Sequence, residues 1–424
     1  MTAQPTNLKT AQRSAHAYSL IDALLPELER IYLDLHAHPE LSLQEVRTAG
    51  IAADWLERCG AEVHTGIGKT GVVGLLKNGD GPVILLRADM DGLPVKEKTG
   101  LPYASQASGV DRFGQSVSIM HACGHDMHVT WLMAVMKILS ETRDSWRGTV
   151  MAVFQPAEEI GAGASGMLAD GMVKRFPKPT VCLGQHLVPL PAGQVGYRAG
   201  TAMSAADSFE VKMFGRGAHG SQPQNSVDPV VMASATVLRL QTIVSREVAM
   251  MDSAVVTVGT IQSGLNENVI PDEAILRLNV RSFKQQVRER VLASVKRIVE
   301  AEATASNAPK PPEFTVISQF PVTINDEAAA AQTMDGMALH SGLAPLHLPE
   351  PLTGSEDFGL FGTAWNVPSV FWLVGGTDHA IWQAAQEKGE PLPVNHSPFF
   401  APQLHPTLKT GVQAMLGAAF AWLE

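Results

Sequence analysis

Cysteine is scarce in this chain, and the few cysteines do not form a disulfide framework. The 424 residues include three cysteines, at positions 59, 123 and 182, which is an odd number at wide spacing. A small secreted domain held by disulfides needs an even and denser set, so a reducing compartment is the simpler interpretation. We expect Cys59 and Cys182, which lie in apolar surroundings, to be inert core residues.

Long apolar runs and basic clusters are missing as well. No stretch reaches the length of a charge-free transmembrane helix, and residues 1–20 lack the apolar core of a secretory signal. Lys and Arg number 32 against 42 Asp and Glu, which gives a net charge of −10 without a basic stripe. These absences argue against nucleic acid and membranes as partners and lead us to expect a cytoplasmic protein.

Most of the chain has the pattern of an α/β protein. Helical spacing of apolar residues predicts a helix over 21–35, which Pro39 follows. Short apolar segments predict buried strands at 70–76, 81–91, 148–155, 180–187 and 368–376, with a buried helix at 127–139. Such alternation indicates helices packed on a mostly parallel central sheet.

Residues 199–318 follow a different pattern. Strands are predicted at 207–215, 253–262, 272–283 and 312–320, with amphipathic helices at 228–246 and 285–304. The order βαββαβ is that of a ferredoxin-like unit. We therefore predict a catalytic α/β domain in two parts, 1–198 and 319–424, with an inserted domain at 199–318.

Polar side chains follow three of the predicted buried strands. Asp89 and Asp91 end one strand, Glu158 and Glu159 follow the second, and His186 ends the third. Because working residues of open α/β sheets lie beyond the carboxyl ends of the strands, we expect these side chains along one edge. Neighbouring residues of an extended segment point in different directions, so one glutamate can bind a metal while the other acts as a base.

The segment "HACGHDMH" at 121–128 adds a thiol and imidazoles just before the buried helix. The partial positive charge of a helix N-terminus favours thiolate and neutral imidazole, the forms that bind metal. Together with carboxylates, Cys123 and His125 suit zinc or its neighbours manganese, cobalt and nickel. We expect His121 and His128 to be packed or supporting residues, and His36 and His38 to cap a helix or lie at the surface.

Several motifs resemble one known family. They are "LLRADMDGLPVKEKTGLPYAS", "MHACGHDMH", "FQPAEEIGAGASGMLADG", "GQHL", "GRGAHGSQP", "NENVIPDEA", "GSEDF" and "NHSP", in this order. The set is similar to the hippurate hydrolase and indole-acetyl-amino-acid hydrolase branch of the di-metal aminoacylase and carboxypeptidase superfamily. The resemblance covers most of the chain.

The resemblance implies a set of site residues. Two divalent metal ions, with zinc the first expectation, would be bound by Cys123, His125, Glu159, His186 and His396. Glu158 matches the general base, and Asp89 and Asp91 would support the ligands from behind. His219 matches a histidine that polarises the scissile carbonyl, often from the partner subunit. Asn268 and Arg281 match residues that hold the carboxylate side of the substrate, a task that suits a planar guanidinium.

The resemblance also gives the insert a role, as a lid that forms a homodimer interface. Two positions depart from the family pattern: Gln224 replaces a second lid histidine, and Leu278-Asn279 replaces a glycine-threonine pair. Either change affects the substrate pocket, and neither affects the metal ligands.

The predicted function is hydrolysis of the amide bond of N-acyl or N-aroyl amino acids by metal-activated water. A cysteine hydrolase with Cys123 as nucleophile and His125 or His128 as base is one alternative. It leaves the Glu158-Glu159 pair unexplained. A non-catalytic protein on the same fold would be expected to have lost a ligand or the base, and none is missing. A dipeptidase or carboxypeptidase of the same superfamily is the third alternative.

Overall fold

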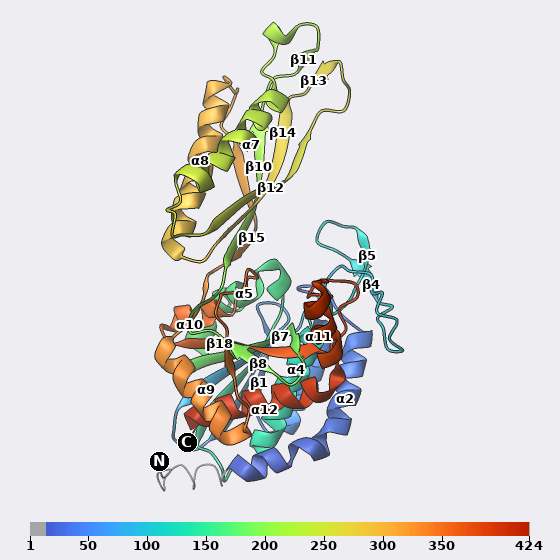
Figure 1. Cartoon of the computed structure of the whole chain (residues 1–424), viewed down its shortest axis with the longest axis vertical. Coiled ribbons are helices and arrows are strands. Elements are labelled where there is room, and N and C mark those ends of the chain that lie inside the picture. The colour runs from blue at the N-terminus through green and yellow to red at the C-terminus, as the bar shows by residue number, and fades with distance from the viewer. Residues whose placement is uncertain (1–13, 424) are drawn as a thin grey trace. The chain divides into compact units, whose positions relative to one another are not determined.

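The computed structural model describes residues 14–423 as two compact units (Figure 1). The first unit runs up to Ala202, from Ile324 to Glu350 and from Asp357 onward, and the second comprises Met203–Thr323 and Pro351–Glu356. The domain boundaries at 198/199 and 318/319 stay a prediction. Between residues 14 and 423, no helix is both long enough and apolar enough to cross a membrane.

The first unit is built on an eight-stranded sheet in the order β1-β2-β6-β3-β7-β18-β8-β17. Its strands are β1 (Glu62–Ile67), β2 (Gly71–Asn78), β3 (Val83–Asp89), β6 (Gly148–Gln155), β7 (Val181–Pro191), β8 (Val195–Tyr197), β17 (Leu346–His347) and β18 (Ser369–Thr377). The four central strands β6, β3, β7 and β18 are parallel, whereas β1 and β2 pair antiparallel with their neighbours. Strand β8 pairs antiparallel with β18 and parallel with β17. The predicted mostly parallel α/β sheet is confirmed.

Helices cover both faces of this sheet. They are α2 (Ile21–Ala37), α3 (Val46–Arg58), α4 (His125–Glu141), α5 (Gly163–Ala169), α6 (Met172–Arg175), α9 (Glu327–Ser341), α10 (Gly359–Trp365), α11 (His379–Lys388) and α12 (Leu404–Leu423). Adjacent residues of β7 identify the faces: Gln185 donates a hydrogen bond to Gly411 O of α12, whereas Gly184 packs against Phe358 beside α10. Because neighbouring strand residues point to opposite faces, α12 and α10 lie on opposite sides.

Helix α4, which packs on the central strands, is buried along most of its length. Every residue from His125 to Met136 is buried. The helix begins after Gly124, whose φ of 83° is left-handed and whose added Cβ would lie 2.5 Å from Leu187. Only glycine meets both demands without strain, so the glycine of "ACGHD" sets where the helix begins.

The second unit is a four-stranded antiparallel sheet in the order β12-β14-β10-β15. Its elements are β10 (Ala205–Phe214), α7 (Pro229–Arg246), β12 (Ala254–Ser263), β14 (Glu273–Ser282), α8 (Gln285–Ala305) and β15 (Glu313–Phe320). The predicted βαββαβ order is confirmed. Alternate residues of β14, such as Leu276 and Leu278, join the core under the helices, which leaves Asn279 and Arg281 on the other face.

Short strands complete both units. They are β4 (Ser108–Val110) paired with β5 (Ser116–Ser118), β9 (Gly200–Met203) paired with β16 (Thr323–Asn325), and β11 (Ala218–His219) paired with β13 (Val269–Ile270). Two 3₁₀ turns, η1 (Glu158–Ile160) and η2 (Pro223–Asn225), are also present.

Helix α12 packs closely on α4 at Gly411, where a side chain would have no room. A Cβ at Gly411 would lie 2.0 Å from Trp131 Cε2, whereas one at Gly359, the first residue of α10, meets nothing within 4 Å. Gly411→Ala should therefore destabilise the first unit by about 1–3 kcal/mol. Gly359→Ala, the control, should be neutral or stabilising by up to about 1 kcal/mol. Denaturant unfolding followed by tryptophan fluorescence measures this unit alone, because all 7 tryptophans lie in it. Equal midpoints for the two variants would contradict the packing.

Candidate metal centre and active site

Parallel pairing aligns the carboxyl ends of three strands. Asp89 at the end of β3 is level with Gln155 at the end of β6, and Arg87 of β3 is level with Gly184 of β7. His186 therefore stands at the level of Asp89. The structure brings together the strand-end residues that the sequence places along one edge.

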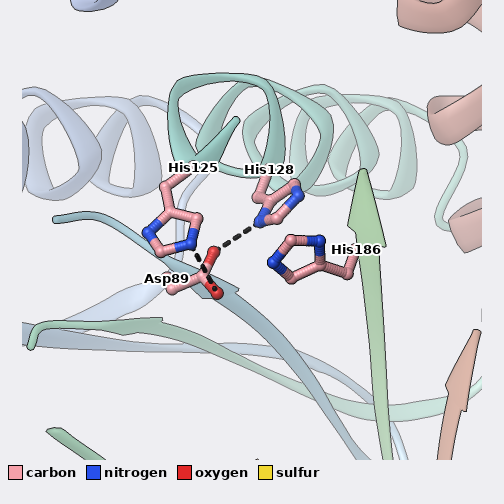
Figure 2. Close-up of side chains that lie close together, drawn as sticks. All are labelled: Asp89, His125, His128 and His186. Atoms are coloured by element: carbon pink, nitrogen blue, oxygen red, sulfur yellow. Dashed lines mark hydrogen bonds and ion pairs between the residues drawn. The ribbon is translucent and has the colours of Figure 1, made fainter. Parts of the chain in front are cut away.

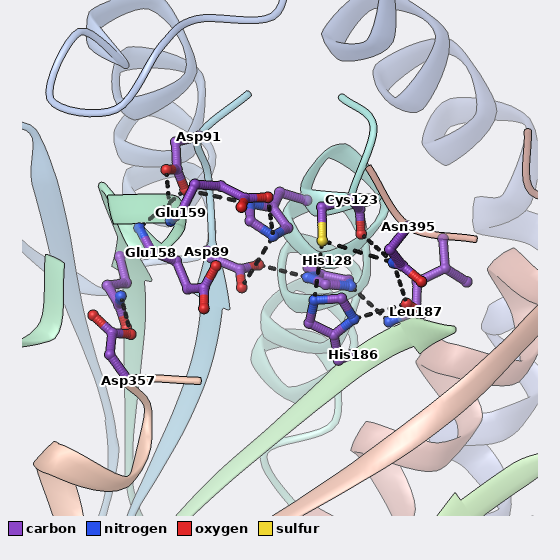
Figure 3. A network of polar contacts seen from close by, with 12 residues as sticks. Asp89, Asp91, Cys123, His128, Glu158, Glu159, His186, Leu187, Asp357 and Asn395 are labelled. Carbon is purple, nitrogen blue, oxygen red and sulfur yellow. Dashed lines mark hydrogen bonds and ion pairs between the residues drawn. The ribbon is translucent and has the colours of Figure 1, made fainter. Parts of the chain in front are cut away.

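The five predicted metal ligands lie close together at this edge. Cys123 Sγ is 3.5 Å from His186 Nε2 (Figure 3). Glu159 Oε2 is 3.3 Å from His396 Nε2. His125 Nε2 lies 3.8 Å from Glu159 Oε1, and Cys123 offers its sulfur within 4.8 Å of both groups. Elements far apart in sequence thus supply one cluster of thiol, imidazole and carboxylate.

The orientation of these donors fits a divalent metal ion. Among the described residues, His125 Nε2 and Glu159 Oε1 are buried without a hydrogen-bond partner. His186 donates its Nδ1–H to the carbonyl oxygen of Leu187 at 2.7 Å, so its Nε2 lone pair faces the thiol. Buried polar atoms without partners are costly, and a cation is the partner that this donor set suits.

Asp91 holds the ligands from behind. Its Oδ1 lies 3.3 Å from His125 Nδ1 and accepts the Glu158 N–H at 3.2 Å, and its Oδ2 accepts the Glu159 N–H at 3.1 Å. The hydroxyl of Ser42 donates to Oδ2 at 2.6 Å. A carboxylate behind a histidine directs the far nitrogen of the ring toward a metal, here His125 Nε2 toward Glu159.

Asp89 and His128 form a second support. Leu187 N–H donates to His128 Nε2 at 2.8 Å, so the proton of this imidazole is on Nδ1, which donates to Asp89 Oδ1 at 2.5 Å. Figure 2 shows Asp89 and His128 together with His125 and His186. Each of these four side chains offers one possible ligand atom, and these atoms lie within 4.8 Å of one another. Both His128 nitrogens are thus engaged in hydrogen bonds, an arrangement that suits the predicted supporting role, which stays a prediction.

Arg87 is a buried residue that the sequence reasoning missed. It pairs with Asp89 at 2.5 Å and with Asp357 at 3.3 Å, and donates to Gln155 Oε1 at 2.9 Å. Burial raises the pKa of Asp89, but Arg87 and the neighbouring imidazoles lower it more, to well below its ordinary value. An arginine within the apolar strand "VILLRAD" is the signal that could have found it, since buried cations need partners.

Asn395 was missed as well. Its Nδ2 donates to Leu187 O at 2.9 Å and to Cys123 O at 3.3 Å, which joins the loop of His396 to two other parts of the site. His396 itself has a positive φ of 72° and donates its N–H to Ala122 O at 2.7 Å. No periodic pattern marks such a loop, so only the resemblance identified His396.

Two sequence expectations need correction. Glu158 and Glu159 are not extended: they begin the turn η1, after Ala157 with a left-handed φ of 52°. The carboxylates still diverge, since Glu159 faces His125 while a Glu158 oxygen lies within 4.8 Å of an oxygen of Asp357.

The second correction concerns the charge at the tip of α4. Burial raises the pKa of the Cys123 thiol, and Glu159, Glu158 and Asp89 raise it further. Burial lowers the pKa of His125, but the nearby carboxylates outweigh it and bring the pKa to about 10. The carboxylates therefore dominate over the helix terminus, and the site as a whole is a region that attracts cations.

The remaining predicted site residues lie in the second unit. Exposed His219 of β11 is next to Asn268, whose carbonyl oxygen accepts the Gly220 N–H at 2.7 Å. Ser221 N–H donates to His219 Nδ1 at 3.1 Å, so the neutral ring carries its proton on Nε2. Arg281 donates to Thr353 O at 2.7 Å through Nη1. The roles of His219, Asn268 and Arg281 stay predictions.

A comparison with known protein families shows which family the chain belongs to. The family model described as Peptidase family M20/M25/M40 matches residues 85–390. The chain belongs to this family.

Named relatives agree with the M20 assignment. N-acetyl-L-cysteine deacetylase of Bacillus subtilis (strain 168) is 36% identical over 364 residues, which cover 85% of this chain and 83% of that protein. Hippurate hydrolase of Campylobacter jejuni is 37% identical over 340 residues, 79% of this chain and 85% of that protein. The crystal structure of B. subtilis YXEP protein, described as a dinuclear metal binding peptidase, is 32% identical with a TM-score of 0.73 and covers 95% of this chain and 99% of its own. The resemblance inferred from the motifs is confirmed, and this M20 protein is an amidohydrolase.

The prediction for His36 is wrong. Only 1% of it is exposed, and its Nδ1 lies 2.7 Å from Asp126 and its Nε2 3.2 Å from Glu97. Burial lowers the pKa of His36, but the two carboxylates raise it more, to about 9. The two histidines of "HAH" thus differ. His36 is a buried cation beside Asp126, whereas His38 is exposed at the end of the helix, as expected.

This burial predicts a pH-dependent stability. Because the folded-state pKa of about 9 exceeds the ordinary value, the stabilisation by His36 is fully present below pH 6.5 and is lost as the pH rises through 9. His36→Gln should cost on the order of 3 kcal/mol more at pH 6 than at pH 9.5. Unfolding of both proteins across this range measures the difference. Exposed His38→Gln is the control, and a His36→Gln effect that does not change with pH would contradict the charged state of His36.

Proposed function

We propose that this M20 protein hydrolyses the amide bond of N-acyl or N-aroyl amino acids to a carboxylic acid and a free amino acid. The observation that carries the proposal is the cluster of Cys123, His125, Glu159, His186 and His396 beside Glu158. The relatives named for N-acetyl-L-cysteine and hippurate, both N-acyl amino acids, support this substrate class.

Two divalent metal ions would be held by the five clustered residues, with Asp89 and Asp91 behind them. When bound, such ions lower the pKa of an attacking water and polarise the amide carbonyl. The thiol and imidazoles favour zinc, and manganese, cobalt and nickel are the alternatives. The thiol and His125 must lose their protons when a metal binds, so affinity should rise with pH.

The protein's own residues carry the protons. Glu158 accepts a proton from the water that attacks the carbonyl carbon and donates it to the leaving amide nitrogen. His219 donates a hydrogen bond from Nε2 to the carbonyl oxygen as negative charge develops there. Arg281 and Asn268 hold the carboxylate of the amino acid.

The insert at 199–318 acts as a lid in this proposal and forms a homodimer. The protein would work in the cytoplasm on small molecules, without nucleic acid or membrane as partners. The acidic net charge of −10 supports the exclusion of nucleic acid.

The alternatives have less support. A Cys123 nucleophile needs an activated thiolate, whereas burial and three carboxylates raise the pKa of this thiol. A dipeptidase of the same superfamily differs in requiring a free amino end on its substrate, and a carboxypeptidase differs in accepting a peptide in place of the simple acyl group.

Release of free amino acid from a panel of N-acetyl, N-benzoyl and N-indole-acetyl amino acids, with dipeptides included, tests the reaction. Glu158→Gln should lower kcat about 10²–10⁴-fold with unchanged metal content, because the proton acceptor is lost. Exposed Glu62→Gln is the matched control. Chelation should abolish activity and added zinc, manganese or cobalt should restore it. Activity that survives chelation would contradict the metal mechanism, and hydrolysis of dipeptides alone would favour the peptidase.

Mixed dimers test whether His219 acts across the dimer. If it does, co-refolded Glu158→Gln and His219→Ala chains form heterodimers in which one of the two sites has both residues intact. Random mixing should then restore about a quarter of wild-type activity, since half of the dimers are mixed and half of their sites are complete. If His219 acts within its own chain, the mixture stays as inactive as either variant.

A further inference from the structure

Glu45 is a buried carboxylate that takes no part in the proposed reaction steps. It lies between α2 and α3 with 0% of its surface exposed. Its Oε1 accepts the N–H groups of Leu43 at 2.9 Å and Ala157 at 2.8 Å, and its Oε2 accepts the Thr70 hydroxyl at 2.6 Å. A carboxylate with this many donors is held in one orientation.

The hydrogen bond from Ala157 to Glu45 fixes the residue that directly precedes the turn η1, which carries Glu158 and Glu159. Ala157 directly precedes Glu158, and its φ of 52° is in the left-handed region that alanine rarely adopts. Its N–H is held by Glu45, and the next two N–H groups, of Glu158 and Glu159, are held by Asp91. Two carboxylates thus bind three successive amides of the turn.

The two carboxylates are fixed relative to each other. Gly92, the residue after Asp91, donates its N–H to Glu40 O at 2.7 Å, and Ser42 donates its hydroxyl to Asp91 at 2.6 Å. The segment around residues 40–45 therefore carries Glu45 and holds Asp91 at the same time. A turn fixed at three amides by one rigid segment has its side-chain directions determined.

A purely structural role as a helix cap does not account for Glu45. It occupies the N-cap position of α3, but its side chain makes no capping hydrogen bond there. Glu40 performs that task, accepting the N–H groups of Arg47 at 2.9 Å and Thr48 at 2.8 Å. The Glu45 side chain is directed instead to the turn that carries Glu158 and Glu159.

We propose that Glu45 is a positioning residue for hydrolysis: by holding the Ala157 N–H, it fixes the turn that directs Glu159 toward the metal ligands and Glu158 toward the substrate. The roles of Glu158 and Glu159 rest on the proposed function. The contribution of Glu45 is geometric, through hydrogen bonds to the turn rather than through its charge.

Variants of Glu45 and Glu40 test the proposal. In Glu45→Ala, kcat should fall about 10–100-fold with KM within about twofold, and zinc affinity measured by competition with a chromophoric chelator should fall about 10–100-fold. In Glu45→Gln, the amide oxygen still accepts both N–H groups and the amide nitrogen donates to Thr70, so both quantities should return to within about threefold of wild type. Glu40→Ala, the matched control, keeps the backbone carbonyl that accepts the Gly92 N–H and removes only the side chain that caps α3. It should lower the unfolding temperature and leave kcat and zinc affinity unchanged.

The outcomes separate the possibilities. If Glu45→Ala lowers only the unfolding temperature, as Glu40→Ala does, Glu45 is structural and the proposal is wrong. If Glu45→Gln is as impaired as Glu45→Ala, charge rather than geometry is responsible, and the positioning role is overturned. Zinc affinity is measured without substrate, so a wild-type protein inactive on the whole panel would count against the proposed function and leave this test intact.

Discussion

The site depends on one interaction, the acceptance of backbone N–H groups by the buried carboxylate of Asp91. Its two oxygens bind the amides of Glu158 and Glu159 and face the ring of His125, so one side chain aligns the proposed base and two of the proposed metal ligands. The charge of Asp91 is tolerable in the interior because each oxygen has donors. A rigid arrangement of this kind is what metal-assisted hydrolysis requires, since misplaced ligands or a misplaced base lose rate steeply.

The surplus of buried carboxylates explains the composition of the rest of the site. Asp89 is compensated by Arg87 and His128, and Asp357 by Arg87 and Gln155. Burial raises the pKa of Cys123, and Glu159, Glu158 and Asp89 raise it further. Burial lowers the pKa of His125, but Asp89, Asp91 and Glu159 raise it more. The compensated carboxylates therefore build the frame of the site. The negative electrostatic potential of the carboxylates acts on the place where the thiol, His125 and Glu159 meet. A divalent cation bound there would lower the electrostatic energy of the site most.

The sequence predicted the sheet, the buried helix and the edge that carries the site, because β-branched apolar segments and strand-end polar residues are local signals. It failed where contacts join distant segments. The sequence marks His36 as a helix-end residue and does not show its partners Asp126 and Glu97. It likewise marks Arg87 as a strand residue and does not show its ion pair with Asp357. The turn at Ala157 was equally invisible, since alanine carries no signal for a left-handed φ. Tertiary partners decide such positions, and a single sequence does not show them.

The burial of the site residues separates two kinds of contribution to catalysis. Cys123, His125 and His186 are packed among α4 and the strand ends, where a substitution alters the core as well as the chemistry. His219 is exposed on a two-residue strand, hydrogen-bonded through its ring only to Ser221 among the described residues. Its removal leaves both hydrophobic cores untouched. In the proposed function, the residues expected to bind metal are thus preorganised by folding, whereas changes at His219 should act on rate without acting on stability.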